Sequence, residues 1–287
     1  MQINVERIDP GADSSFRVYS YGFPEAVQAF HVHEEWELAA VEGAGGVLSC
    51  GAATSEFASG DLFLFGGRLP HRFVPHPGRI PGAPATGLAL VAQFRFDALG
   101  ADFFRLPENA ELRELLEAAD AGLAFRGRGG EPLSALLRAS GSRRVTGLLT
   151  LLTDLADDRR RGAVEALTAG GRPLALRGSD AERLSRLQDY IESAFADGAS
   201  VDGAADRLAL TRTSFCRYVR RTTGRTFTDL LNDYRLTVAS MLLRDPAAPV
   251  SRVSADAGFG SLSHFNARFK GRFGMTPGEF RSRAARS

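Results

Sequence analysis

Hydrophobic residues change their spacing along the chain, and the change separates two kinds of region. Between about residues 16 and 96 they fall into short runs rich in Phe and Val, which Gly and Pro separate. Runs of this kind are typical of β-strands, and several at this spacing predict a sandwich or small barrel. The runs are AVQAFHVHEEWELAAVEG, GVLSC, GDLFLFGG and GLALVAQFRF.

Helical periodicity follows this β-rich region. The stretch PENAELRELLEAADAG predicts a helix that ends at Gly122 and whose apolar face carries Leu112, Leu115, Leu116 and Ala119. A second helix is expected around residues 143–157, with an apolar stripe formed by Val145, Leu148, Leu149, Leu152 and Leu155. Each stripe needs a surface to pack against.

The last part of the chain is predicted to be helical throughout. Residues 161–178 contain paired glycines and a proline without a sustained period, and we interpret them as an interdomain linker. They separate residues 1–160 from residues 179–287. Helices are expected near residues 180–196, 201–208, 212–222, 227–243, 250–257, 262–272 and 277–284.

This helical part contains a weak internal duplication. VDGAADRLALTRTSFCRYVRRTTGRTFTDLL aligns without a gap on VSRVSADAGFGSLSHFNARFKGRFGMTPGEF. Phe215 then matches His264 or, with a shift of one residue, Phe265, and Gly224 and Gly274 end equivalent helices. Each copy predicts a short helix, a tight turn and a second helix. That is the helix-turn-helix plan, in which the second helix enters the major groove of DNA.

The first candidate recognition helix has a basic face. At about 100° per residue, Phe215, Tyr218 and Val219 form its buried stripe. The opposite side carries Thr213, Arg217 and Arg220, with Arg221 beside them. Arginine near the start of such a helix suits bidentate pairing with guanine, and Arg220 and Arg221 suit phosphates. A solvated basic face is the alternative interpretation.

The second candidate recognition helix has a weaker signature. We expect its buried residues to be Leu262, Phe265, Phe269 and Phe273. The opposite side carries Ser263, His264, Ala267 and Gly271, flanked by the phosphate-binding candidates Arg268 and Lys270. His264 is either a donor to a base edge or a surface histidine. Because Ala267 and Gly271 offer no polar atoms, this helix is expected to read bases poorly.

Charge divides the chain in the same way as periodicity. The net charge is +1, but residues 209–287 hold 14 basic against 5 acidic residues, and the remainder 21 against 29. The basic end therefore favours a polyanionic partner. Cys50 and Cys216 form no CxxC pair, which fits a reducing cytoplasm. No run approaches about 18 apolar residues, and the start lacks a secretory pattern, so we expect no membrane span.

GFGSLSHFNARFKGRFGMTPGEFR resembles the C-terminal motif of the AraC/XylS family of bacterial transcription regulators, and the stretch LALTRTSFCRYVRRTTGRTFTDLLNDYRL resembles the family's first helix-turn-helix. The resemblance covers about 105 residues. It implies base-reading sites at Thr213, Arg217, Ser263, His264 and Ala267. It also implies promoter DNA and RNA polymerase as partners, a bacterial cytoplasmic location and homodimers. The helix around residues 143–157 is then either a dimer interface or core packing on the barrel.

The histidines gather in the β-rich region, where four of the five lie within residues 31–76. On a strand His31, His33 and Glu37 would share one face because their separations are even. Glu35 would share that face too, which predicts a crowded acidic pocket or a bulge. Trp36 alternates to the other face and is expected in the core.

HVHEEWELAAVEG and GDLFLFGGRLPHRF resemble the two motifs of cupin-type sensor domains. This resemblance implies a β-barrel and places His71 opposite His31, His33 and Glu37. The three imidazoles and one carboxylate that it would bring together suit Zn²⁺, Ni²⁺, Mn²⁺ or Fe²⁺. The same residues can hold a metal, line the pocket of a small-molecule effector, or hydrogen-bond within the barrel.

The fold expected is therefore α+β: a cupin-like barrel with helices, followed by an all-α domain with two helix-turn-helix motifs. The function expected is a transcription regulator that senses a small molecule or metal. The alternative is a cupin metalloenzyme fused to a DNA-binding tail.

Overall fold

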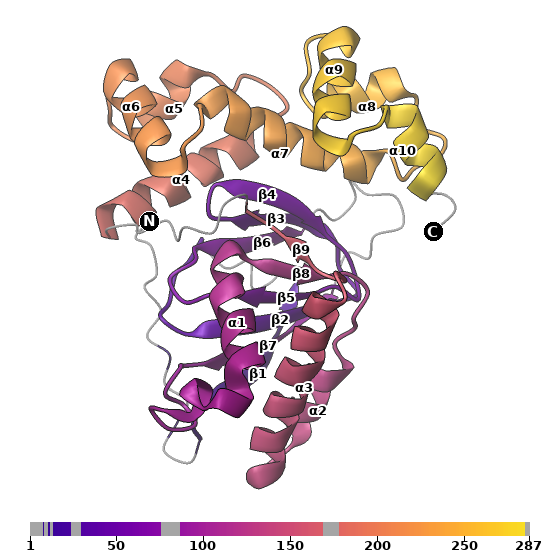
Figure 1. Cartoon of the computed structure of the whole chain (residues 1–287). Helices are drawn as coiled ribbons and strands as arrows, with labels where there is room; N and C mark the ends of the chain where they lie inside the picture. The colour runs from indigo at the N-terminus through magenta and orange to yellow at the C-terminus, as the bar shows by residue number, and fades with distance from the viewer. Residues whose placement is uncertain are drawn as a thin grey trace.

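The computed structural model describes residues 8, 11, 14–23, 30–75, 87–168 and 178–284. Antiparallel sheets fill the N-terminal half and helices the C-terminal third, so the α+β class is confirmed (Figure 1). The strands are β1 (Arg17–Phe23), β2 (Trp36–Glu42), β3 (Gly46–Cys50), β4 (Ala53–Phe57), β5 (Leu62–Phe65), β6 (His71–Pro75), β7 (Gly87–Phe94), β8 (Leu123–Phe125) and β9 (Glu165–Ala166).

These strands form two sheets with apolar side chains between them. The larger sheet has the order β1-β7-β2-β5-β8-β9 and the smaller β4-β3-β6, with antiparallel pairing throughout. Residues of β2 and β5 alternate between two cores, one between the sheets and one under the helices, so both faces are buried. This is why LFLF reads as an unbroken apolar run rather than an alternating one.

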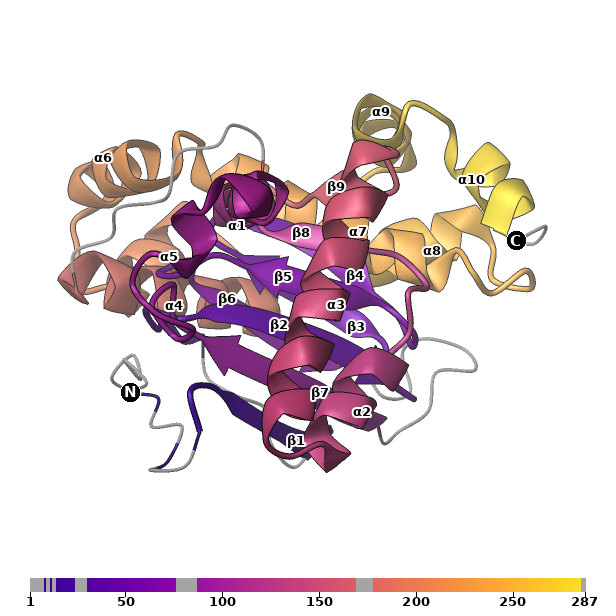
Figure 2. The ribbon, with the colours of Figure 1, turned by 60° about the horizontal axis from the view of Figure 1, so that its bottom comes forward.

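Three helices cover the outer face of the larger sheet: α1 (Ala110–Ala118), α2 (Glu131–Arg138) and α3 (Ser142–Arg160) (Figure 2). The predicted stripe of α1 is buried, and the chain turns at Gly122, whose φ of 65° favours glycine. On α3 the buried residues are Leu148, Leu151, Leu152, Leu155 and Ala156, all within the sheet-and-helix core. This apolar stripe therefore packs inside the chain, and a dimer interface formed by it is not supported.

The segment expected to be a linker contains a short strand. Ala124 pairs with Glu165 and Leu123 with Ala166, which adds β9 to the edge of the larger sheet. Local sequence could not indicate this strand, because a two-residue pairing depends on a partner about 40 positions away. The remainder of the predicted linker, residues 169–177, lies outside the described residues.

The helical domain matches the sequence prediction closely. Its helices are α4 (Gly178–Ala194), α5 (Val201–Arg207), α6 (Arg212–Thr223), α7 (Phe227–Leu242), α8 (Val250–Asp256), α9 (Leu262–Phe273) and α10 (Pro277–Ala284). The prediction that the two copies align without a gap is wrong by one residue. Whereas α8 begins 49 residues after α5, α9 begins 50 residues after α6. The second turn is one residue longer, so Phe215 corresponds to Phe265, and both rings are buried.

Two predicted core residues of α9 are not fully buried. Leu262 is 43% exposed and Phe273 is partly buried, whereas Phe265 and Phe269 are fully buried in the second helical core. Leu262 is the first residue of the helix, directly after its N-cap Ser261. A helical wheel places this residue by angle alone, but at this end of the helix none of the described elements covers that angle.

The two domains share an apolar seam. Phe30 and Val47 of the sheet domain belong to the same buried cluster as Leu184, Leu187 and the other core residues of the first helical unit. Helix α7 lies along β4 (Figure 1), where Thr54 Oγ1 and Thr237 Oγ1 are 3.3 Å apart. Arg244 forms an ion pair with Glu56 at 2.7 Å. Apolar and polar contacts together therefore hold the helical domain against the smaller sheet.

We predict that Leu152→Ala lowers the free energy of unfolding by about 2–5 kcal/mol, because the side chain is fully buried within its own chain. The exposed neighbour Thr150→Ala is the control, with an expected effect within about 0.5 kcal/mol. Urea denaturation of the two variants and the wild type measures both changes. An effect of Leu152→Ala no larger than that of Thr150→Ala would contradict the assignment of this stripe to the core of the chain.

Candidate nucleic-acid interface and candidate metal site

Helix α6 presents a basic face that the first helical core leaves uncovered. The Thr211 side chain accepts a hydrogen bond from the Ser214 N–H and so caps the helix, and Gly224 ends it in the left-handed conformation. Phe215, Tyr218 and Val219 are buried as predicted. The predicted DNA-facing residues Thr213, Arg217 and Arg220 are exposed. Within the described part of the chain no ion pair engages Arg217 or Arg220.

Arg221, also predicted to bind phosphate, has an intramolecular partner. Its two terminal nitrogens lie 2.9 and 3.3 Å from the carboxylate of Asp180 at the start of α4. The Asp180 carboxylate raises the pKa of Arg221 above its ordinary value, through the hydrogen bond and its charge. Arg221 therefore ties α6 to α4 in this structure, and a phosphate contact by it stays a prediction.

Helix α9 is the second candidate recognition helix, capped by Ser261 and ended by Gly274. The residues of α9 predicted to face DNA are exposed, namely Ser263, His264, Ala267 and Lys270. Asn266, which was not predicted to face DNA, is exposed as well. Arg268 turns toward α7, where Nη1 lies 3.9 Å from Asp229 Oδ1, while its Nε donates to His264 Nε2 at 3.4 Å. Arg268 and His264 thus engage each other, and their DNA contacts stay predictions.

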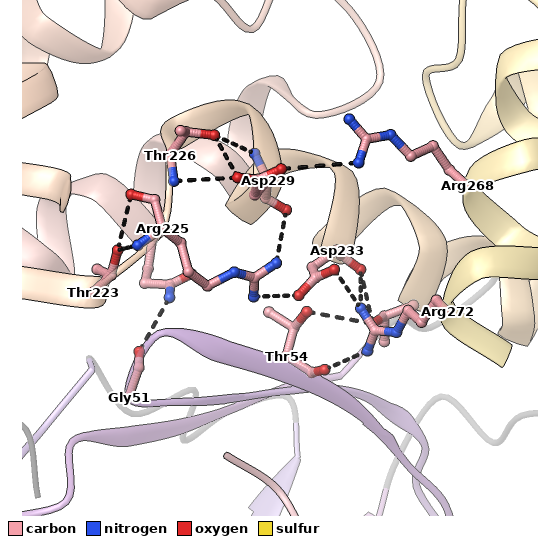
Figure 3. A network of polar contacts seen from close by, with 11 residues as sticks. Gly51, Thr54, Thr223, Arg225, Thr226, Asp229, Asp233, Arg268 and Arg272 are labelled. Carbon is pink, nitrogen blue, oxygen red and sulfur yellow. Dashed lines mark hydrogen bonds and ion pairs between the residues drawn. The ribbon is translucent and has the colours of Figure 1, made fainter. Parts of the chain in front are cut away.

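Asp233, which sequence analysis did not single out, joins the two helix-turn-helix units (Figure 3). It lies on α7 and pairs with Arg225, which follows α6, and with Arg272 of α9 at 3.2 Å. Arg272 Nη2 also donates to the backbone oxygen of Thr54 on β4 at 2.7 Å. One carboxylate therefore connects both units, and Arg272 extends the connection to the sheet domain. The signal for this connection in the sequence is a matched spacing: Asp229 and Asp233 are four residues apart, and so are Arg268 and Arg272.

The four residues predicted as metal ligands come together in the sheet domain. His31, His33, Glu37 and His71, which we call the histidine cluster, are buried, and one ligand atom from each lies within 4.8 Å of all the others. The assumed regular strand is not what brings them together. The chain bends at residues 34 and 35, and β2 begins only at Trp36. Glu35 is not among the four residues, although its Oε2 lies 3.9 Å from His33 Nδ1. Trp36 is partly buried and packs against the core, near Phe94 and Phe96.

The hydrogen bonds of the cluster match the needs of a metal site. His33 Nδ1 lies 3.0 Å from the Glu35 carbonyl, and His71 Nδ1 lies 2.8 Å from the Leu69 carbonyl. Since a carbonyl only accepts, both Nδ1 atoms carry the proton, which leaves the Nε2 atoms to face Glu37 at 3.0 and 3.2 Å. A ring held through Nδ1–H to a carbonyl, with Nε2 directed inward, is the usual arrangement of a metal-binding histidine. The residues therefore fit a divalent ion.

Without a cation, the cluster must place protons between Glu37 and the rings. Burial alone would raise the pKa of Glu37, but the charge of His71 and the hydrogen bonds from both rings hold it well below its usual range. Burial alone would lower the pKa of His33, but the hydrogen bond and charge of Glu37 outweigh burial and raise it. Positive charge beside the Glu37 carboxylate is thus favoured both with and without a bound cation.

Gln93 is a further residue of this site that sequence analysis missed. It lies opposite Glu37 in the register of β7 on β2 and is fully buried. Its Nε2 donates to Glu37 Oε2 at 2.8 Å, while Oε1 has no hydrogen-bond partner among the described residues. The signal in the sequence is a single polar residue inside the apolar strand segment GLALVAQF. Gln93 therefore fixes the orientation of the Glu37 carboxylate.

The cluster lies directly behind the contact with the helical domain. His31 and His71 form an isolated antiparallel bridge, with N–H to carbonyl distances of 3.3 and 3.2 Å in the two directions. Their neighbours serve the other domain: Phe30 is buried in the first helical core, and Arg72 reaches α4. Arg72 is 6% exposed and pairs with Asp189 at 2.6 Å and with Glu192.

Comparison with known proteins bears on the helical domain. Residues 204–283 match a family model described as a helix-turn-helix domain. The HTH-type transcriptional activator RhaS of Escherichia fergusonii is 35% identical over 99 residues, which are 34% of this chain and 36% of that protein. Its counterpart from Escherichia coli K12 is 33% identical over 103 residues, or 36% and 37% of the two chains. The chain therefore spans little more than a third of the length of these relatives.

Solved structures with similar segments include a DNA-binding transcriptional dual regulator of Escherichia coli K-12. It is 24% identical, with a TM-score of 0.34, and the match covers 37% of this chain and 94% of that one. ToxT of Vibrio cholerae, bound to a naphthalenyl butenoic acid, is 12% identical with a TM-score of 0.36 and covers 94% and 100% of the chains.

The two capped helix pairs and the matched family model define the C-terminal region as a double helix-turn-helix domain. Together with the likeness to RhaS, they confirm for this domain the resemblance to AraC/XylS regulators. Of the described helices, none combines the length and apolar character that crossing a membrane requires.

Proposed function

We propose that this protein is a transcription regulator that binds promoter DNA through α6 and α9 and responds to a divalent metal ion at the histidine cluster. The DNA-binding part is supported by the helix-turn-helix match and by the exposed face of α6 with Arg217 and Arg220. RNA polymerase is the partner on which such a regulator acts, and a homodimer stays a prediction.

The observation that carries the sensing proposal is the adjacency of cluster and interface. Two short segments, residues 30–31 and 71–72, each supply one histidine to the cluster and one neighbour to the helical domain. An ion that draws His31 and His71 toward Glu37 therefore acts on the same backbone that positions Phe30 and Arg72. Since adjacent residues share one peptide unit, their movements are coupled.

A metal ion suits this site better than a large organic effector. The space between the two sheets is filled by aromatic side chains, among them Phe57, Phe63, Phe65 and Phe73. Phe65 stacks on His71 with ring centroids 4.1 Å apart. The donor set of three imidazoles and one carboxylate suits Zn²⁺, Ni²⁺, Mn²⁺ or Fe²⁺. A bound divalent ion would place positive charge next to the buried Glu37 carboxylate.

The alternative proposal, a metalloenzyme with a DNA-binding tail, requires an open site as well as a bound ion. A substrate would need a path to the ion, whereas the four side chains are 0–5% exposed and Phe65 covers one of them. The burial of the cluster therefore favours sensing over turnover.

Arg217→Ala is expected to weaken binding to a selected promoter sequence by about 1–3 kcal/mol, the value of one bidentate contact to a base. Fluorescence anisotropy at fixed salt measures the change. Arg138→Ala, an exposed arginine on α2 of the sheet domain, is the matched control and should leave affinity unchanged. Equal affinities for both variants would remove Arg217 from the interface.

Purified protein is expected to bind about one divalent ion per chain, as a site with four protein ligands does. Elemental analysis after dialysis against each candidate metal measures the stoichiometry. His33→Ala should lose the ion, whereas His264→Ala, which removes an exposed histidine from α9, should retain it. Retention of the ion by His33→Ala would place the metal elsewhere.

Arg72→Met is expected to weaken the coupling between the two domains while leaving the ion bound. The substitution removes the ion pairs to Asp189 and Glu192 but keeps an apolar stem of similar length. Anisotropy titrations of the metal-loaded and metal-free forms should then give closer DNA affinities than in the wild type. If the wild type itself shows no difference between the two forms, the sensing proposal fails and the DNA-binding proposal stands.

A further inference from the structure

The helix caps place the two recognition helices in a common register. Thr211 and Ser261 cap the N-termini, and Gly224 and Gly274 end the helices, each pair separated by 50 positions. In this register Thr213 corresponds to Ser263. On α6 one exposed stripe at helical spacing consists of Thr213, Cys216, Arg217 and Arg220, and on α9 it consists of Ser263, Asn266, Ala267 and Lys270. We call these the two reading stripes.

On α9, Asn266 is the residue of the reading stripe whose side chain best suits the reading of a base. Ala267 stands where α6 has Arg217 and offers no polar side-chain atom. Lys270 is a point charge that suits a phosphate, and the single hydroxyl of Ser263 pairs with either kind of base edge. The neighbouring Arg268 is held by Asp229 and His264, beside the stripe rather than on it.

The Asn266 side chain carries a donor and an acceptor side by side. Adenine presents the complementary pair in the major groove, an N6–H donor and an N7 acceptor, and asparagine binds both at once. Asn266 is exposed on α9, and no hydrogen bond to the described residues engages its amide. The Asn266 side chain is shorter than that of glutamine, but it can still reach a base because the small Ala267 beside it lets the helix backbone approach the groove closely.

We propose that Asn266 is the base-reading residue of the second unit and that it recognises an adenine. The proposal rests on the proposed DNA-binding function and deepens it. The two units then read different bases: Arg217 recognises guanine in one major-groove segment, and Asn266 recognises adenine in the next. The second unit therefore contributes to sequence specificity, although Ala267 itself reads nothing.

Selection of binding sites from a randomised DNA duplex pool, followed by sequencing, tests this directly. Wild-type protein is expected to enrich sites with two preferred segments, separated by about one turn of the double helix. Asn266→Ala should lose the adenine preference at one position of one segment, with roughly 5- to 150-fold less discrimination there, and keep the guanine preference of the other. Arg217→Ala should give the opposite pattern.

Lys270→Ala is the matched control on the same helix. It should weaken binding to every sequence and reduce the salt dependence without changing the preferred bases. Because Asn266 is exposed, its variant is expected to melt at the wild-type temperature, so an altered preference cannot come from misfolding.

An unchanged preference in Asn266→Ala overturns the proposal, as does a lost preference for a base other than adenine. Failure of the wild-type protein to enrich any sequence is a different outcome: it would overturn the proposed function itself.

Discussion

The seam between the sheet domain and the helical domain is the contact on which the rest of the molecule depends. Phe30 and Val47 of the sheet domain pack into the core of the first helical unit. Beside them, the buried guanidinium of Arg72 is balanced by Asp189 and Glu192. A buried charge is tolerated only when it is paired, so this ion pair fixes α4 in one position on β6. The histidine cluster, α4 and the recognition helices are then parts of one connected structure.

Electrostatics within the helical domain decide which basic residues remain available to a partner. The excess of arginine in residues 209–287 predicts a polyanionic partner, but it overstates the charge that faces solvent. Asp180 engages Arg221, Asp229 engages Arg268, and Asp233 engages Arg225 and Arg272. Arg217, Arg220 and Lys270 stay exposed on the reading stripes. The acidic residues of α4 and α7 thus pair with arginines that do not lie on those stripes. The positive charge available to a partner then lies on the stripes.

Much of the fold could be predicted because its signals are local. The seven C-terminal helices follow from apolar spacing and from caps such as Thr211 and Gly224, and the structure places their ends within about two residues of the prediction. The stripe of α3 was recognised, but its partner was not, because an apolar face does not say whether it packs on its own chain or on another. Strand β9 was not predicted because it depends on pairing with a distant part of the chain. The sequence left the one-residue shift between the two units open, and the length of the second turn decides for it.

By itself, the sequence determined the class of the protein, the location of the recognition helices and the four residues of the histidine cluster. The first two depend on residue type and short-range spacing, which the polypeptide backbone converts into helix faces. The histidine cluster depends on the resemblance to cupin motifs, which supplied His71. Only the tertiary structure decided that the cluster adjoins the domain seam, that Gln93 orients Glu37, and that Arg268 faces α7 while Asn266 faces outward. Those outcomes depend on which side chains meet across elements far apart in the chain. Burial and ion pairing settle that, and periodicity does not.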